Sequence, residues 1–258
     1  MTRVICVANQ KGGVGKTTTA VNLSASVAVA EKKVLLIDID PQGNSTSGIG
    51  LNKEESVRTI YQALLRGSGL REVIQKTELP FLEMVVSNTD LIGAEIELIH
   101  EKDRERKLEG LIKEVEADYD FVFIDCPPSL GLLTINSLTA AHSVIIPLQC
   151  EYYAMEGLGQ LLKTIRLIKQ SLNPKLEVEG ILLTMFDGRN NLSHQVAEEI
   201  RKHFKDKVFN TIIPRNIRLS EAPSHGKPVL LYDIHSKGAE SYLNLAREIL
   251  ANGRTNGN

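Results

Sequence analysis

The 258-residue sequence predicts an α/β fold, in which helices cover both faces of a mostly parallel, twisted sheet. Three observations predict it. Short apolar runs alternate with longer stretches of helical periodicity. Several runs, such as residues 34–37 and 121–124, are apolar throughout, which is typical of strands buried on both faces. The first run leads directly into a glycine-rich loop, which is then followed by a helical stretch.

The apolar runs define seven expected strands, at residues 3–8, 33–39, 81–86, 120–125, 143–148, 178–185 and 208–213. The helical stretches between them lie at residues 16–31, 56–66, 102–117, 132–141, 154–171, 191–205 and 237–251. Connections of this length favour parallel strands with right-handed crossovers. Because functional residues of such sheets gather at the carboxyl ends of the strands, we expect residues 11–18, 38–42, 125–129 and 147–151 to lie side by side.

Composition fits one domain over residues 1–251, followed by a disordered tail at 252–258. No run of about 18 apolar residues is present, so we expect no membrane span. The three cysteines are far apart and odd in number, which favours free thiols and a cytoplasmic location. The scattered histidines and the lack of a C-x-x-C pair argue against a zinc site.

The loop after the first strand predicts a phosphate-binding site. It consists of Lys11, Gly12, Gly13, Val14, Gly15, Lys16, Thr17 and Thr18. Glycines let backbone N–H groups converge on an anion, and the following helix directs its positive end to the same place. In the usual G-x-x-x-x-G-K-[ST] loop, the lysine contacts the β/γ-phosphates and the hydroxyl ligates Mg²⁺. Those roles fall to Lys16 and Thr17, so the fold resembles the three-layer sandwich of P-loop NTPases.

The loop departs from the usual pattern in two ways. The first glycine of the motif is replaced by Gln10, and Lys11 adds a second cation. A dinucleotide-binding turn is the alternative, since Gly13 and Gly15 have its G-x-G spacing and acids follow at Asp38 and Asp40. However, a pyrophosphate bridged to two riboses needs no Lys-Thr pair for a magnesium ion. We therefore favour a nucleoside triphosphate.

Carboxylates end two of the expected strands. Asp125 follows a buried strand, and beside a phosphate loop such an acid holds the hydration shell of magnesium. Asp38 and Asp40 stand at i and i+2, so on an extended chain they point the same way. Either could hold a metal-bound water or orient the water that attacks the γ-phosphate. We favour Asp40 as the catalytic acid because it lies nearer the loop end of its strand.

Lys11 has two possible roles. A second cation is useful where charge builds on the leaving oxygen of the triphosphate in the transition state. If two copies face each other, Lys11 of one copy could reach the nucleotide of the other. A phosphate contact within the same chain, or simple exposure, is the alternative, and the sequence leaves the choice open.

Positive charge gathers late in a chain whose net charge is −2. Residues 185–227 hold eight Lys and Arg against five Asp and Glu. The eight are Arg189, Arg201, Lys202, Lys205, Lys207, Arg215, Arg218 and Lys227. This bias is compatible with a surface that binds a polyanion and also with the solvated face of a helix.

Together these motifs resemble the ParA/Soj chromosome- and plasmid-partition ATPases, within the MinD-like group that has a deviant Walker A loop. The resemblance rests on residues 11–18, 38–44 and 124–129, and it extends to 150–157 and 213–228. It covers roughly residues 2–250, and five ordered motifs are far more specific than any one of them. It implies a slow, Mg²⁺-dependent ATPase that binds ATP and ADP.

The resemblance also implies roles for single residues. Lys11 would act across an ATP-sandwich homodimer, and Asp40 would orient the attacking water. The remaining nucleotide contacts would come from the loop residues 12–18, from Glu151 near the dimer face, and from Pro214 and Asn216 at the adenine. The ATP-bound dimer would bind double-stranded DNA without sequence preference through Arg189 and Arg218, and phosphate contacts alone would make that binding sensitive to salt.

A ParB/Spo0J-like centromere-binding protein would stimulate hydrolysis and release the DNA, which places the protein at the nucleoid. This partner is implied by the resemblance only. The resemblance also leads us to expect no membrane partner and no site-specific repression, because the chain starts at its first strand without a preceding helix-turn-helix.

Three other functions share parts of the pattern. A MinD-like membrane-associated ATPase needs a C-terminal amphipathic helix, and no such stripe follows Leu250. An iron–sulfur ATPase needs paired cysteines, and Cys126 and Cys150 lack that spacing. A DNA-coating protein in which ATP only locks the assembly is the third, and the behaviour of an Asp40 variant would separate it from an ATPase.

Overall fold

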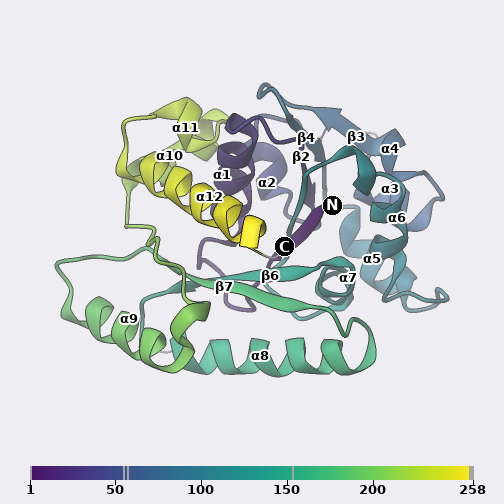
Figure 1. Cartoon of the computed structure of the whole chain (residues 1–258). Helices are drawn as coiled ribbons and strands as arrows, with labels where there is room; N and C mark the ends of the chain where they lie inside the picture. Colours follow the sequence, from purple (N-terminus) through teal and green to yellow (C-terminus); the bar gives the residue numbers. More distant parts are fainter. Residues whose placement is uncertain (1, 55, 57, 153, 256–258) are drawn as a thin grey trace.

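A seven-stranded sheet forms the centre of the molecule (Figure 1). The computed structural model describes residues 2–54, 56, 58–152 and 154–255, with 252–255 described by their backbone alone. The strand order is β3-β4-β2-β5-β1-β6-β7. The strands are β1 (Arg3–Val7), β2 (Val34–Asp38), β3 (Ile74–Lys76), β4 (Leu82–Val85), β5 (Phe121–Asp125), β6 (Ser143–Gln149) and β7 (Glu177–Thr184). Neighbouring strands are parallel except for β3 and β4, which confirms the mostly parallel sheet.

Helices cover both faces of this sheet. The longer ones are α1 (Lys16–Val29), α5 (Leu91–Leu98), α6 (Lys107–Lys113), α7 (Leu132–Ala140), α8 (Ala154–Ser171), α9 (Asn191–Phe204) and α12 (Lys237–Thr255). The shorter ones are α2 (Asn44–Gly48), α3 (Ile60–Leu65), α4 (Leu70–Val73), α10 (Ile217–Glu221) and α11 (Val229–Tyr232), with 3₁₀ turns at Glu116–Asp118, Lys205–Lys207 and Ala222–His225. Helix α1 packs along α12 on one face, whereas α5–α9 lie on the other (Figure 1).

Every strand except β3 contributes side chains to two hydrophobic cores, which explains the continuous apolar runs. In β5, Val122 and Ile124 enter the core under α5–α9. Phe121 and Phe123 enter the core under α1 and α12, because successive side chains of a strand point to opposite faces. The sheet is therefore a buried middle layer, and its polar strand ends are where solutes have access.

The strand expected at 208–213 is wrong. Isolated bridges at Val208 and Pro214, and single backbone hydrogen bonds from Phe209 and Ile213 to β7, connect this region to the sheet. The backbone N–H groups of Asn210 and Thr211 donate to the Glu248 side chain, at 2.8 and 3.1 Å, instead of to β7. The Glu248 carboxylate of α12 thus satisfies two consecutive backbone donors of this segment.

Other elements differ from the expected boundaries. The helix expected at 102–117 is shorter and starts at Lys107, and that expected at 56–66 starts at Ile60, where Thr59 and Gln62 form a capping box. Helix α5 and the antiparallel β3 were not foreseen. Helix α12 continues to Thr255, four residues into the expected tail, while 256–258 lie outside the described residues.

Two loops on the α1 side of the sheet meet backbone to backbone. Gly50, after α2, and Gly226, before α11, both have positive φ, at 89° and 61°. A Cβ at Gly50 would lie 2.8 Å from the carbonyl oxygen of Gly226, and a Cβ at Gly226 would lie 2.8 Å from the Cα of Gly50. Only glycine fits at either position, so the loop after α2 is joined to the segment that leads into α11.

Candidate functional site

The polar ends of four strands meet at one edge of the sheet. Val7 and Asp38 both lie opposite Asp125 in the register, so the phosphate loop and the two acids are adjacent. The neighbouring β6 joins them because the Asn9 side-chain amide donates to the carbonyl oxygen of Pro147 at 2.7 Å. The structure thus brings together the four segments that the sequence placed at this edge.

The loop between β1 and α1 has the geometry of an anion cradle. Gly15 adopts φ 89° and is the N-cap of α1, a conformation that favours glycine. Gly12 and Gly13 are exposed and line a pocket together with Lys16. Lys16 is 6% exposed, and its Nζ donates to the carbonyl oxygen of Lys11 at 3.0 Å. Burial lowers the pKa of Lys16, against the attraction of nearby Asp125.

Asp38 and Asp125 are fully buried, but they differ in how they are bonded. Asp38 accepts hydrogen bonds from the N–H of Asp40 and from both the N–H and the hydroxyl of Thr46. Burial nevertheless raises the pKa of Asp38 to about 6. Burial, followed by the charge of Asp38, raises the pKa of Asp125 to about 8, and a hydrogen bond from Ser45 opposes the shift. Asp38 therefore positions the loop that follows β2.

Asp40, unlike Asp38 and Asp125, lines the site. It is 5% exposed and lines a pocket of about 620 Å³ together with residues of the phosphate loop. One carboxylate oxygen of Asp40 accepts from the N–H of Gln42 at 2.9 Å, and the Ser87 hydroxyl donates to its backbone carbonyl at 2.8 Å. The carboxylate is thus held at the pocket wall, which a water-orienting group requires.

The donor set fits a magnesium ion. Among the described residues, Asp125 Oδ1 is buried without a hydrogen-bond partner, and Thr17 interacts with the same carboxylate. The residues described contain no cluster of three His, Cys, Asp or Glu side chains suited to a metal. An ion held by the Thr17 hydroxyl, phosphate oxygens and water, with Asp125 on its hydration shell, needs no such cluster.

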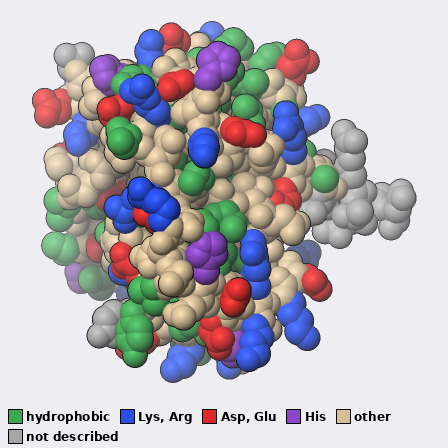
Figure 2. All heavy atoms as spheres, turned by 90° about the vertical axis from the view of Figure 1, so that its left-hand side faces the viewer, with side chains coloured by type: hydrophobic (Ala, Val, Ile, Leu, Met, Phe, Trp, Pro, Cys, Tyr) green, Lys and Arg blue, Asp and Glu red, His purple; other side chains and the backbone are tan. Residues whose placement is uncertain are grey.

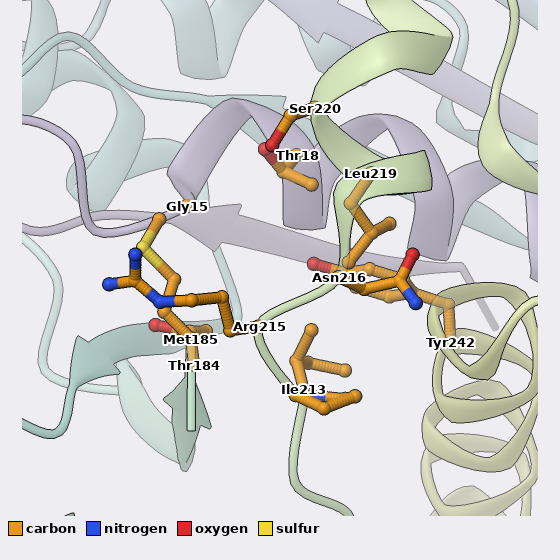
Figure 3. A pocket seen from close by; sticks show the side chains of 11 residues that line it. Gly15, Thr18, Thr184, Met185, Ile213, Arg215, Asn216, Leu219, Ser220 and Tyr242 are labelled. Atoms are coloured by element: carbon orange, nitrogen blue, oxygen red, sulfur yellow. The ribbon is translucent and has the colours of Figure 1, made fainter. Parts of the chain in front are cut away.

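A second pocket adjoins the first. It is open to solvent, contains about 520 Å³ of empty space, and shares Gly15, Thr18 and Met185 with the phosphate pocket. Figure 3 shows Asn216 and Tyr242 on one side of it and Met185 on the other. Asn216 Oδ1 is buried and has no hydrogen-bond partner among the described residues. The two pockets together form a continuous site with a polar phosphate end and a more apolar far end.

Lys11 does not line the phosphate pocket. Its Nζ lies 2.7 Å from Glu151 Oε2, and both side chains are partly exposed. Glu151 also accepts from the Gln149 side-chain amide at 2.5 Å. Lys11 and Glu151 therefore form an ion pair at the rim, and neither lines the two pockets described above.

The two arginines that were expected to bind DNA form ion pairs with acidic residues of the same chain. Arg189 makes a two-point contact with Asp187, at 3.0 and 3.1 Å. Arg218 contacts Glu221 at 2.8 Å and Asp233 at 3.1 Å. Figure 2 shows the side of the molecule with α9–α11, where Lys and Arg side chains are mixed with Asp and Glu. The structure does not bring these arginines into the pockets.

Several residues of the site were not foreseen. The Thr184 hydroxyl donates to the carbonyl oxygen of Val14 and ties the end of β7 to the phosphate loop. Met185 follows with φ 51° and borders both pockets. Ser45 holds Asp125 from α2. Ser45 lies within the polar run after Asp40, and that run could have been used to predict Ser45 as a site residue. Nothing in the sequence around Met185 indicates a left-handed backbone.

Comparisons with known proteins agree with this geometry. A family model described as an AAA domain matches residues 2–178. The chromosome partitioning protein ParA of Myxococcus xanthus is 59% identical over 96% of this chain and 88% of its own length. The sporulation initiation inhibitor protein Soj of Bacillus subtilis is 55% identical over 98% of this chain and all of its own length, 100%.

A solved structure supports the same fold. Cobyrinic acid a,c-diamide synthase of Mycobacterium smegmatis, with bound ADP and magnesium, superposes with a TM-score of 0.88 at 37% identity, over 99% of this chain and 97% of that one. In the described part of the chain, no helix is both long and apolar enough to cross a bilayer. Relatives that are 50–59% identical carry the names ParA or Soj, and the match covers 88–100% of their own length. The chain therefore belongs to the ParA/Soj family of chromosome-partitioning ATPases.

Proposed function

We propose that this chain is a Mg²⁺-dependent ATPase that switches DNA binding in chromosome partition. ATP drives a sandwich dimer, the dimer binds double-stranded DNA without sequence preference, and hydrolysis releases it. A ParB/Spo0J-like protein stimulates the hydrolysis. The observation that supports this most directly is the pair of adjoining pockets, one lined by the phosphate loop and Asp40 and the other by Asn216.

The two pockets match the two ends of ATP. The triphosphate belongs in the pocket with Lys16, Thr17 and the glycines of the phosphate loop. The adenine belongs in the pocket with Pro214 and Asn216, where the unpaired Oδ1 of Asn216 can accept from an exocyclic amino group. The Mycobacterium smegmatis structure holds ADP and magnesium, which supports the same ligands here.

The residues of the site have different roles in hydrolysis. Lys16 neutralises phosphate charge, and Asp40 orients the attacking water. Magnesium, when bound, would supply positive charge that offsets the charge developing on the phosphates. Thr17 would hold the ion directly. Asp125 Oδ1, which has no hydrogen-bond partner among the described residues, would hold it through water. Enclosure of the Asp40 carboxylate at the pocket wall strengthens these interactions, since the local dielectric is low there.

Lys11 fits a role across the dimer. In the single chain its ammonium pairs with Glu151 at the rim, outside the pocket that receives the phosphates. An exposed pair of this kind contributes only about 0.2–1 kcal/mol, so a triphosphate presented by a second copy can displace it. The pair thus keeps Lys11 at the rim, from which it can reach a partner's nucleotide.

We expect Lys11→Ala to bind ATP but to fail to dimerise with it. The alanine removes the ammonium that would cross the interface and leaves the phosphate pocket intact. Size-exclusion chromatography with Mg-ATP would show wild type as a dimer and the variant as a monomer, with ATP affinity unchanged within about threefold. Lys32→Ala, an exposed lysine at the other end of the sheet, is the control. An ATP-dependent dimer of Lys11→Ala would rule out the role in trans.

DNA binding has to compete with the ion pairs of the two arginines. Arg189 and Arg218 are exposed, and both are held by neighbouring carboxylates. Each exposed pair is weak, so phosphate groups can replace the acids. A pair of small basic surfaces, one on each copy, binds much more tightly than a single one. Dimerisation would therefore raise DNA affinity without any change within one copy.

A charge change at either end of the Arg189–Asp187 pair should shift DNA affinity in opposite directions. We expect Arg189→Glu to weaken binding of the ATP-bound protein by about tenfold at low salt. Asp187→Asn frees the guanidinium and should strengthen binding by about two- to fivefold. Fluorescence anisotropy with a labelled duplex measures both, and basal ATP turnover should stay constant. Equal affinity in all three proteins would exclude this surface.

A further inference from the structure

The carboxylate of Asp40 depends on its backbone for its place in the site. Among the described residues its side chain has one hydrogen-bond partner, the N–H of Gln42, which belongs to the same turn and would move with it. Asp40 itself lies beyond the end of β2, in the connection to α2. If Asp40 orients the attacking water, as proposed above, an error of about 1 Å in its position costs about a hundredfold in rate. Contacts that fix the Asp40 backbone therefore bear on hydrolysis.

Four hydrogen bonds close a ring through that backbone, which we call the Asp40 ring. The N–H of Asp40 donates to Asp38 Oδ1 at 3.1 Å. The Thr46 hydroxyl donates to the other oxygen, Asp38 Oδ2, at 2.8 Å. The same hydroxyl accepts from the N–H of Ser87 at 3.1 Å, and the Ser87 hydroxyl donates to the carbonyl oxygen of Asp40 at 2.8 Å. The Asp40 ring thus joins the end of β2 to α2 and to the segment after β4.

The Asp40 ring is buried. Asp38, Thr46 and Ser87 have no exposed surface, and Asp40 is 5% exposed, so solvent is a poor replacement for a lost partner. An ionised carboxylate and a carbonyl oxygen can only accept hydrogen bonds. The acceptors on Asp38 and Asp40 therefore need donors from the protein, and Thr46 and Ser87 supply the two hydroxyls of the ring.

The turn that carries Asp40 also lies directly against Ser87. Gly43 ends this turn at φ 61°, and its N–H donates to the carbonyl oxygen of Asp40 at 2.9 Å. A Cβ at Gly43 would lie 2.8 Å from the backbone carbonyl oxygen of Ser87, so only glycine fits there. The segment after β4 therefore meets the turn at Gly43 as well as at Asp40.

We infer that Thr46 and Ser87 are positioning residues of the site, which hold the Asp40 backbone so that its carboxylate stays at the pocket wall. Neither residue lines the phosphate pocket. Their effect on hydrolysis passes through Asp40, and it rests on the ATPase function proposed above. The Thr46 hydroxyl takes part in two bonds of the Asp40 ring and the Ser87 hydroxyl in one, so the loss of the Thr46 hydroxyl should have the larger effect.

Two substitutions of Thr46 test the role of its hydroxyl. Thr46→Val nearly preserves the shape of the side chain and removes two bonds of the Asp40 ring, whereas Thr46→Ser keeps the hydroxyl. We expect Thr46→Val to lower kcat by about ten- to a hundredfold and to leave the Kd for Mg-ATP within about threefold of wild type. Thr46→Ser should keep kcat within about threefold of wild type. Phosphate release and isothermal titration calorimetry measure the two quantities.

Thr139→Val is the matched control. Thr139 is 4% exposed in α7, and its hydroxyl donates to the carbonyl oxygen of Ile135 at 2.8 Å, outside the Asp40 ring. This variant should lower the melting temperature, as Thr46→Val does, but leave kcat unchanged. Ser87→Ala removes only the hydroxyl bond to Asp40 and should lower kcat by about three- to tenfold, so it decides the matter if Thr46→Val does not fold. Wild-type kcat in Thr46→Val or in Ser87→Ala, or a loss that persists in Thr46→Ser, would overturn the inference.

Amide hydrogen exchange separates this inference from the proposed function. The backbone N–H groups of residues 39–43 should exchange faster in Thr46→Val than in wild type, and at the wild-type rate in Thr46→Ser and Thr139→Val. Unchanged exchange in Thr46→Val would contradict the inference whatever the rate of ATP turnover. A wild-type protein without turnover would instead count against the proposed function, while the exchange measurement would still decide whether the Asp40 ring holds the turn.

Discussion

Replacing Lys16 with alanine should abolish ATP binding. Lys16 is the one cation among the described residues that line the phosphate pocket, and its ammonium is largely buried there. Without it, the charge of the triphosphate would face Asp40 and the buried Asp125 with no side-chain counterion. A lost charge-assisted contact in an enclosed site costs about 3 kcal/mol or more, which corresponds to at least about a hundredfold in affinity. Isothermal titration calorimetry with Mg-ATP measures it.

A matched control separates this effect from a general loss of positive charge. Lys33 lies at the opposite end of the sheet, just before β2, so Lys33→Ala should bind Mg-ATP as wild type does. Circular dichroism of Lys16→Ala should be unchanged, because among the described residues the side chain has a single hydrogen-bond partner, the carbonyl oxygen of Lys11. Near-normal ATP affinity in Lys16→Ala would place the triphosphate elsewhere.

Asp40→Ala should separate ATP binding from ATP hydrolysis. The carboxylate lines the phosphate pocket but is not needed to hold the phosphates, so affinity for Mg-ATP should stay close to that of wild type. Turnover should fall by about 10²–10⁴, the usual contribution of a positioned acid–base group. The protein should then persist as an ATP-bound dimer on DNA. Phosphate release, size-exclusion chromatography and DNA anisotropy with ADP, ATP and no nucleotide measure all three properties.

The same experiment decides between an ATPase switch and a DNA-coating protein that uses ATP only to assemble. Asp206→Ala, in the exposed turn after α9, is the control and should leave turnover unchanged. If Asp40→Ala hydrolysed ATP at the wild-type rate, Asp40 would not be the catalytic acid. Loss of ATP binding in this variant would instead assign Asp40 to the magnesium shell.

The fold class and the edge of the sheet that carries the site were predictable, because both depend on local patterns. Buried parallel strands must be apolar throughout, and the phosphate loop requires its glycines and Lys16 close together in the sequence. The Asp125 carboxylate at a strand end is equally local. The roles of these residues stay predictions until the variants above are measured.

What could not be predicted depends on contacts between distant segments. Residues 208–213 have the composition of a strand, but the Glu248 side chain from α12 takes two of their backbone donors. Helix α5 was missed because Ile92 and Ile96 face solvent, which obscures the helical periodicity. Arg218 pairs with Asp233, fifteen residues later. This contact depends on how the chain turns back between the two residues, so the sequence alone does not predict it.

The contact between Gly50 and Gly226 has a consequence for how the molecule opens. Neither loop has room for a side chain at that point, so the two backbones are in direct contact. If one loop moves away, the backbone of both loops becomes exposed to solvent. Amide hydrogen exchange should therefore report the loop after α2 and the turn before α11 as a single opening unit, with similar protection and similar dependence on denaturant. Ligands that slow exchange in one of them should slow it in the other to the same extent.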